Sequence, residues 1–335
     1  MNSRVEFGLI MALTIRGLAV GNFEDMKSVA REAERLDFDS VWLCDHFLTL
    51  DPSSYAKDAG FEDDGDSEGV GSGSIPLLET WTALSALSQV TSKLRLGTSV
   101  LSNSYRIPSV LAKMGATLDH ISGGRLDLGL GAGWMQEEYE AYGIPFPRAS
   151  VRIAQMEEAV QLIRKIWTEP NPTFEGEHYT IKGAVCDPPP VQKPSPPIWI
   201  GGEGKKVLRA AARHADGFNV RWWPPERYLE RKDEIDANCA EAGRDPQAFR
   251  RSLMCLLLPS YDRTRVEAEK KRFAAIPQTG IIAGEPSECV EKMMEYVDAG
   301  VRHFLYTIPD VAEMDMLRLA GEEILPEVRN LSNGG

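Results

Sequence analysis

Short apolar runs rich in valine, isoleucine and leucine alternate along the chain with longer segments whose apolar residues recur at helical spacing. This alternation is typical of parallel strands that are joined by helical crossovers. Eight strands are predicted, at residues 5–10, 40–44, 94–100, 125–130, 197–200, 217–220, 251–257 and 302–307. Eight such units favour a closed (β/α)8 TIM barrel over an open sheet.

Helices are predicted between these strands. The helix expected over residues 22–36 has apolar residues on one face, namely Met26, Val29, Ala30, Ala33 and Leu36. A stripe of this kind packs against a sheet, so we assign none of its residues to a ligand.

Two segments interrupt the repeat. Residues 51–74 are acidic and rich in glycine and serine, so they cannot form a core of their own, and they are expected to be either a mobile lid or a disordered loop after strand 2. Residues 171–197 end in a proline-rich run that cannot continue a helix, and we expect this insertion to lie against the barrel before strand 5. The prediction is one domain over residues 1–335, with insertions at about 51–75 and 171–197.

Composition narrows the class of protein. The net charge of −13 opposes binding to nucleic acid or to anionic membranes, because those polyanions would be repelled. The five cysteines form no C-x-x-C pair, which argues against a zinc site and a disulfide framework. The first 20 residues do not resemble a signal peptide, and no apolar run is long enough to span a membrane. We therefore expect a cytoplasmic protein that acts on a small molecule and has no metal site.

The fourth predicted strand runs directly into three alternate glycines, Gly129, Gly131 and Gly133. Glycines there allow backbone to approach a flat ligand, or they relieve crowding where a helix crosses the strand end. A dinucleotide fingerprint is excluded locally, because Trp134 stands where its third glycine would fall.

In a TIM barrel the functional residues gather at the carboxyl ends of the strands. His46 is the histidine that lies at such an end beside a carboxylate, Asp45, so it is the candidate acid or base. The sequence leaves open which of the two points inward. His303 falls near the start of strand 8, at the stability face. The other predicted strand-end residues are Ser99, Val100, Gly131, Gly133, Gly201, Gly202 and Asn219.

A glycine-rich turn follows strand 5. Gly201, Gly202 and Gly204 precede a predicted helix, and Lys205 and Lys206 open it. Free backbone N–H groups and the helix dipole could bind a phosphate here, and the alternative is a loop with solvated lysines.

Several of these segments resemble one known family. The motifs are WLCDHF, LGTSVLSNSYRIP, SGGRLDLGLGAGW followed by an acidic helix and YGIPFP, and IWIGGEGKKVLRAAARHADGFN. Together they span most of the chain and resemble the luciferase-like flavin and deazaflavin oxidoreductases. The resemblance is greatest to the branch that uses the deazaflavin coenzyme F420, and it implies hydride transfer between F420 and a small organic substrate. The alternatives are an FMN-dependent monooxygenase that uses O2 and a separate flavin reductase, and a non-catalytic flavin-binding paralogue.

The resemblance also implies roles for individual residues. His46 would be the catalytic acid or base, Asp45 would bind or orient the ring, and a non-proline cis peptide would join Ser99 to Val100. The other cofactor-binding residues would be Gly131, Gly133, Trp134, Glu137 in the acidic helix, Gly201, Gly202, Gly204 and Asn219.

One departure from the family concerns the substrate. Some F420-dependent dehydrogenases have a glutamate right after the strand 4 glycines, where this chain has Trp134, and this argues against a sugar-phosphate substrate. Trp134, Trp222 and Trp223 could form an apolar substrate wall. Relatives are commonly dimers, so a homodimer is possible.

Overall fold

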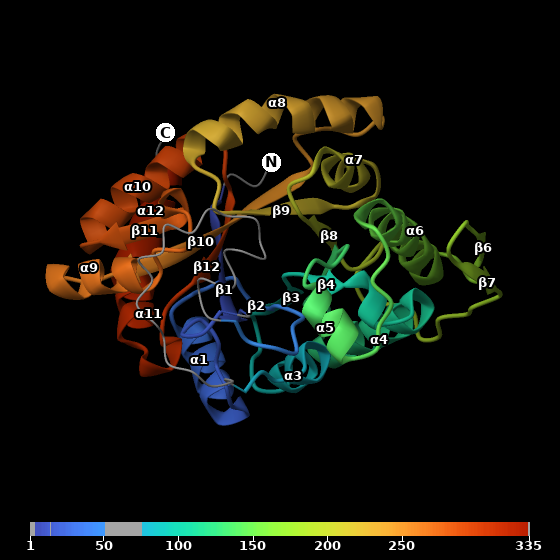
Figure 1. Ribbon diagram of the computed structural model, residues 1–335, viewed down its shortest axis with the longest axis horizontal. Coiled ribbons are helices and arrows are strands. Elements are labelled where there is room, and N and C mark those ends of the chain that lie inside the picture. Colours follow the sequence, from blue (N-terminus) through green and yellow to red (C-terminus); the bar gives the residue numbers. More distant parts are fainter. Residues whose placement is uncertain (1–3, 14, 51–75, 334–335) are drawn as a thin grey trace.

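A closed barrel of eight parallel strands forms the centre of the molecule, and helices surround it (Figure 1). The structure is a computed structural model that describes residues 4–13, 15–50 and 76–333. Around the ring the strands are β1 (Glu6–Ala12), β2 (Ser40–Leu43), β3 (Arg95–Thr98), β5 (Leu126–Gly131), β8 (Ile198–Gly201), β9 (Gly217–Arg221), β10 (Arg250–Pro259) and β12 (His303–Thr307). Pairing of β9 with β10 and of β12 with β1 closes the ring. The predicted (β/α)8 barrel is confirmed.

The helices cover the outside of the barrel. The first, α1 (Phe23–Arg35), begins after Asn22, whose side chain accepts a hydrogen bond from the Asp25 backbone N–H at 2.9 Å. Met26, Val29, Ala30 and Ala33 of α1 are fully buried, as their spacing predicts. The other principal helices are α3 (Thr80–Leu87), α4 (Pro108–Ser122), α6 (Ala149–Thr168), α7 (Lys205–His214), α8 (Pro225–Glu241), α9 (Arg263–Arg272), α10 (Pro286–Asp298) and α12 (Leu325–Asn333). Within the described ranges, no helix is long and apolar enough to cross a bilayer.

Two strands of the main sheet were not predicted. β4 (Leu101–Ser102) pairs with β5, because the chain bends after β3 and returns to the sheet. β11 (Ile281–Gly284) pairs with the second half of β10, which is longer than its neighbours. Neither could be read from periodicity, because each is short and depends on a partner strand that is distant in the sequence.

The insertion before β8 packs on α4. It contains a hairpin of β6 (Thr173–Glu175) and β7 (Thr180–Lys182), followed by the proline-rich run. The Gln192 side chain donates to Asp119 Oδ1 of α4 at 2.7 Å, and His120 Nε2 lies 2.7 Å from the Pro189 carbonyl oxygen. The other predicted insertion, residues 51–75, lies outside the described residues.

A polar cluster fills the amino-terminal end of the barrel. Asp127 is 2% exposed, and it accepts hydrogen bonds from Arg95 Nε at 2.6 Å and from Trp199 Nε1 at 3.1 Å. His303 lies between the rings of Trp42 and Trp199, and burial together with Arg250 lowers its pKa to about 3. His303 is therefore neutral and structural, at the end of the barrel where the sequence places it.

We predict that Asp127→Ala lowers the free energy of unfolding by about 3 kcal/mol, because it breaks the ion pair with Arg95. This is at the low end of the destabilisation expected when a buried ion pair loses one partner, since Arg95 is partly exposed. Urea unfolding followed by circular dichroism measures this change. Glu295→Ala, which removes the exposed partner of Lys292, is the control and should change stability by less than ~1 kcal/mol. Equal effects of the two substitutions would contradict a special role of the buried cluster.

Candidate active site

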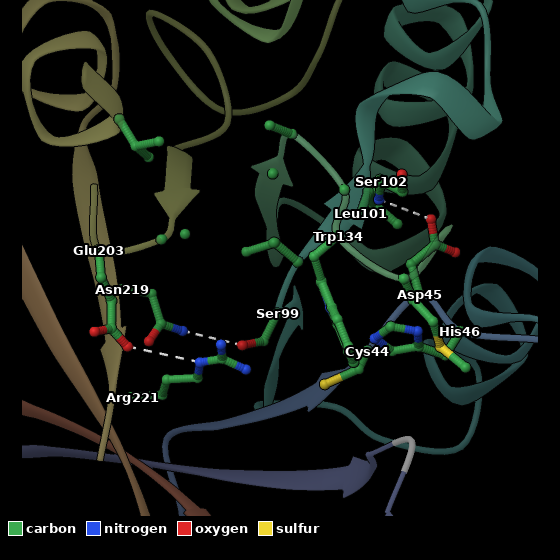
Figure 2. Close-up of a pocket in the computed structure, with 18 of the residues that line it drawn as sticks. Cys44, Asp45, His46, Ser99, Leu101, Ser102, Trp134, Glu203, Asn219 and Arg221 are labelled. Carbon is green, nitrogen blue, oxygen red and sulfur yellow. Dashed lines mark hydrogen bonds and ion pairs between the residues drawn. The ribbon is translucent and has the colours of Figure 1, made fainter. Parts of the chain in front are cut away.

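A cavity of about 580 Å³ opens at the carboxyl ends of β2, β3, β5, β8 and β9 (Figure 2). This volume lies within the range of small-molecule sites. The structure brings ten of the predicted site residues to its lining: Asp45, His46, Ser99, Val100, Gly131, Gly133, Trp134, Gly201, Gly202 and Asn219. Gly204 and Glu137 are not among the lining residues, and both are exposed.

The wall behind the cavity is built around Val100. The Ser99–Val100 peptide bond is cis, as the family resemblance implies. A Cβ atom placed on Gly131 would lie 2.5 Å from Val100 Cγ2, and one placed on Gly201 would lie 2.8 Å from Val100 Cγ1. The glycines therefore relieve crowding against Val100, and by doing so they allow its side chain to line the cavity.

A hydrogen bond fixes the polar part of the same wall. Asn219 Nδ2 of β9 donates to Ser99 Oγ at 3.0 Å (Figure 2). Both side chains are buried, so the bond fixes the segment that follows β3 to β9.

Both carboxyl oxygens of Asp45 take part in a salt bridge with Arg106. Its carboxylate accepts from Arg106 Nη1 at 2.7 Å and Nη2 at 3.0 Å, and from the Ser102 backbone N–H at 3.0 Å. Asp45 therefore ties the end of β2 to the segment after β3, which fits an orienting role better than direct ring binding. Arg106 lies in one of the motifs that resemble the family, but no pattern in the sequence pairs it with Asp45.

His46 lines the cavity beside Trp134, whose ring meets the imidazole edge to face with centroids 5.4 Å apart (Figure 2). Its Nδ1 atom lies 2.8 Å from Oε2 of Glu138, a residue of α5 (Gln136–Ala141) that is completely buried. Glu138 also accepts hydrogen bonds from the backbone N–H groups of Phe47 and Leu48, and from Tyr105 Oη. Burial opposes ionisation, yet the hydrogen bonds from His46 and these backbone groups lower the pKa of Glu138, so it is a carboxylate.

Glu138 is the residue of the acidic helix that contacts His46. The sequence interpretation selected Glu137, which is exposed and outside the cavity lining. Met135, Glu138 and Tyr139 form the buried face of this segment, at spacings of three and four residues. Helical periodicity counted from Met135 would have selected Glu138.

The positive groups at the cavity are arginines rather than the predicted lysines. Lys205 and Lys206 are exposed and do not line the cavity. The lining contains Arg152, Arg221 and Arg227 instead. They come from α6, β9 and α8, so only the fold could show that they meet.

Glu203 organises two of these arginines. It accepts a hydrogen bond from Arg227 Nη2 at 3.0 Å and lies 3.6 Å from Arg221 Nε (Figure 2). Trp223 Nε1 also donates to Glu203, at 2.9 Å. Trp222 and Trp223 are buried and absent from the lining, so the predicted apolar wall is reduced to Trp134.

Arg152 is the third arginine and the most deeply buried, with 8% exposure. Its guanidinium contacts the carbonyl oxygens of Pro147 and Gly133 and stacks on Phe146 at 3.8 Å. In the part of the chain that the structure describes, it forms no ion pair with a carboxylate, and its Nε atom has no hydrogen-bond partner. A buried guanidinium in this state can bind an anion at the cavity.

A closed TIM barrel with this cavity at the carboxyl ends of its strands defines the class of protein, a barrel enzyme built to bind a small organic group. The chain belongs to the luciferase-like monooxygenase family, which it matches over residues 6–279. The family resemblance seen in the sequence is thereby confirmed.

Individual relatives cover nearly the whole chain. An F420-dependent glucose-6-phosphate dehydrogenase of Nakamurella multipartita is 33% identical, over 93% of this chain and 94% of the relative. The corresponding protein of Microbacterium testaceum is 32% identical, over 89% of this chain and 91% of the relative. The solved structure of an F420-dependent secondary alcohol dehydrogenase in complex with an F420–acetone adduct has a TM-score of 0.76 at 22% identity, over 97% of this chain and 99% of that one. At that identity the likeness shows the fold.

We predict that Gly131→Ala destabilises the protein by about 1–3 kcal/mol, because the new methyl group overlaps Val100. The loss should be smaller when Val100 is also alanine, so a double-mutant cycle measured by urea unfolding should show coupling between the two positions. Gly204→Ala is the matched control, since Gly204 has an ordinary φ of −72° and the nearest atom to an added Cβ is 4.0 Å away. An uncoupled cycle would mean that Gly131 serves another purpose.

Proposed function

We propose that this protein is an F420-dependent oxidoreductase that transfers a hydride between coenzyme F420 and a small organic substrate. The relatives that are 32% and 33% identical over most of the chain are F420-dependent dehydrogenases, and this supports the choice of coenzyme. The observation that carries the proposal is the position of His46, whose ring lines the cavity while its Nδ1 atom is held by a buried carboxylate.

The residues at the cavity fit a planar, anionic coenzyme. Val100, supported by Gly131 and Gly201, would hold the ring, as would Ser99 and Asn219. The lining arginines Arg152, Arg221 and Arg227 would meet negatively charged groups of the coenzyme. When bound, F420 supplies a two-electron hydride donor or acceptor.

The protein itself supplies the proton and the orientation. With Nδ1 engaged by Glu138, His46 has Nε2 available at the cavity. In the oxidising direction Nε2 would accept the proton of a substrate hydroxyl group, and in the reducing direction it would return a proton to a carbonyl oxygen. Asp45, held by Arg106, would keep the end of β2 in place during both steps.

The surroundings of His46 favour a substrate without a phosphate group. Trp134 packs against the buried cluster that contains Leu13, Cys44 and Met254, and all four residues line the cavity, so its wall beside His46 is largely apolar. The named relatives act on glucose 6-phosphate, but the indole of Trp134 offers no charge to a phosphate. A small neutral alcohol or carbonyl compound suits this wall better.

Two alternative functions have less support than the proposed one. An FMN-dependent monooxygenase is the second candidate, because the monooxygenase RslO1 from Streptomyces bottropensis has the same fold with a TM-score of 0.75 at 20% identity. A non-catalytic flavin-binding paralogue is disfavoured, because it would have no need of the buried Glu138 that holds His46. A homodimer and a cytoplasmic location stay predictions.

Parallel binding titrations with F420 and FMN test the coenzyme. We expect F420 to bind at least tenfold more tightly, a difference of about 1.4 kcal/mol, measured by quenching of coenzyme fluorescence. Preference for FMN would overturn the proposal in favour of the monooxygenase, and binding of neither would support the non-catalytic alternative.

Replacement of His46 tests the proton transfer. His46→Ala should reduce kcat by about 100-fold or more while the affinity for F420 is retained, as expected when a general acid or base is removed. Stopped-flow absorbance of the coenzyme with a panel of small neutral alcohols measures kcat, and a titration measures affinity. His120→Ala, at an exposed histidine of α4, is the control. Unchanged turnover in His46→Ala would remove His46 from the mechanism.

A further inference from the structure

Glu138 is a fully buried carboxylate whose hydrogen bonds reach the end of β2 and the segment after β4. We infer that Glu138 is a positioning residue that holds neutral His46 in its Nδ1–H tautomer and thereby keeps the Nε2 lone pair available to the substrate. The catalytic consequence rests on the proposed role of His46, whereas the tautomer does not.

The hydrogen bonds and the lowered pKa of Glu138 together indicate that both of its oxygens are acceptors. Oε1 accepts from the backbone N–H of Phe47 at 2.7 Å and of Leu48 at 2.9 Å, and a backbone N–H can only donate. Oε2 accepts from Tyr105 Oη at 2.8 Å. The lowered pKa of Glu138 agrees with an ionised, acceptor-only group.

An acceptor at Oε2 requires a donor at His46 Nδ1, 2.8 Å away. A neutral imidazole carries one proton, so a proton on Nδ1 leaves Nε2 as an acceptor. Among the described residues Nε2 has no hydrogen-bond partner, and the ring lines the cavity. The lone pair of Nε2 is therefore free for a hydroxyl proton.

The other titratable groups near His46 do not compete with Glu138. Burial raises the pKa of Asp45, hydrogen bonds from Arg106 oppose this rise, and these bonds engage both of its carboxyl oxygens. Burial raises the pKa of Cys44 to about 12, and burial and the charge of Glu138 raise the pKa of Tyr105, so both are neutral. Glu138 is thus the carboxylate that directs the imidazole.

Glu138→Gln changes the hydrogen bonding with little change of shape. The amide oxygen has to remain beside Phe47 and Leu48, because an NH2 group there would face two donors. The amide nitrogen then faces His46 Nδ1, which has to become an acceptor, while the hydroxyl of Tyr105 can rotate to accept as well. The neutral ring is forced into the Nε2–H tautomer, which cannot accept a substrate proton.

The tautomer can be measured directly by 15N NMR of protein labelled at its five histidines, with His46 assigned from its loss in His46→Ala. Once the spectrum at alkaline pH shows a single protonated ring nitrogen, we expect this to be Nδ1 in the wild type and Nε2 in Glu138→Gln. The variant should lose kcat by a factor on the order of 10² to 10⁴ and keep its affinity for F420, as other enzymes do when the orienting carboxylate of a histidine is lost.

Glu140→Gln is the matched control, because it makes the same change at another, exposed residue of α5 that does not line the cavity. It should leave both the tautomer and kcat unchanged. A merely structural role of Glu138 would change stability without exchanging the protonated nitrogen.

Three results would overturn the inference: protonated Nε2 in the wild type, a wild-type tautomer in Glu138→Gln, or wild-type kcat in that variant. If the protein does not bind F420, the proposed function fails but the NMR result still decides the role of Glu138. If Glu138→Gln does not fold, the wild-type spectrum decides the tautomer. Tyr105→Phe, which keeps the bond between Glu138 and His46, should then retain protonated Nδ1.

Discussion

Buried carboxylates have to find hydrogen-bond donors, and this requirement organises the carboxyl end of β2. Asp45 and Glu138 are 2% and 0% exposed. Asp45 obtains its donors from Arg106 and the Ser102 backbone, and Glu138 obtains its donors from His46, Tyr105 and the backbone after His46. The loop after β2, the segment after β3 and helix α5 are therefore joined at one place, and the ring of His46 is held at the cavity as a consequence.

A steric constraint shapes the opposite wall. Val100, in the segment after β3, occupies the space that side chains on Gly131 and Gly201 would need. Glycine at these positions of β5 and β8 therefore leaves room for Val100. Gly131 and Gly201 thus line the cavity themselves and also leave room for Val100. The crowding that they relieve comes from Val100 and not from a helix that crosses the strand end, and the approach of a flat ligand to their backbone stays a prediction.

The distribution of charge at the cavity is opposite to that of the whole chain. The chain has a net charge of −13, yet three arginines line the cavity, and Arg152 has no carboxylate partner among the described residues. Membership of the luciferase-like monooxygenase family accounts for the barrel. Under the proposed function, the local arginines would meet the anionic coenzyme, and the apolar wall beside His46 would favour a substrate without a phosphate group.

The sequence by itself determined the barrel, the strand ends that meet at one mouth and the candidacy of His46, because strand and helix periodicities are local and the carboxyl ends of parallel strands necessarily share a face. Tertiary structure alone decided the partners. Glu138 is 92 residues from His46 in the chain, and Arg106 is 61 residues from Asp45. One residue along a helix turns a side chain by about 100°, which is why Glu137 is exposed and its neighbour reaches the histidine. Which glutamate of α5 faces His46 depends on how this helix packs on the barrel, and no local pattern encodes that packing.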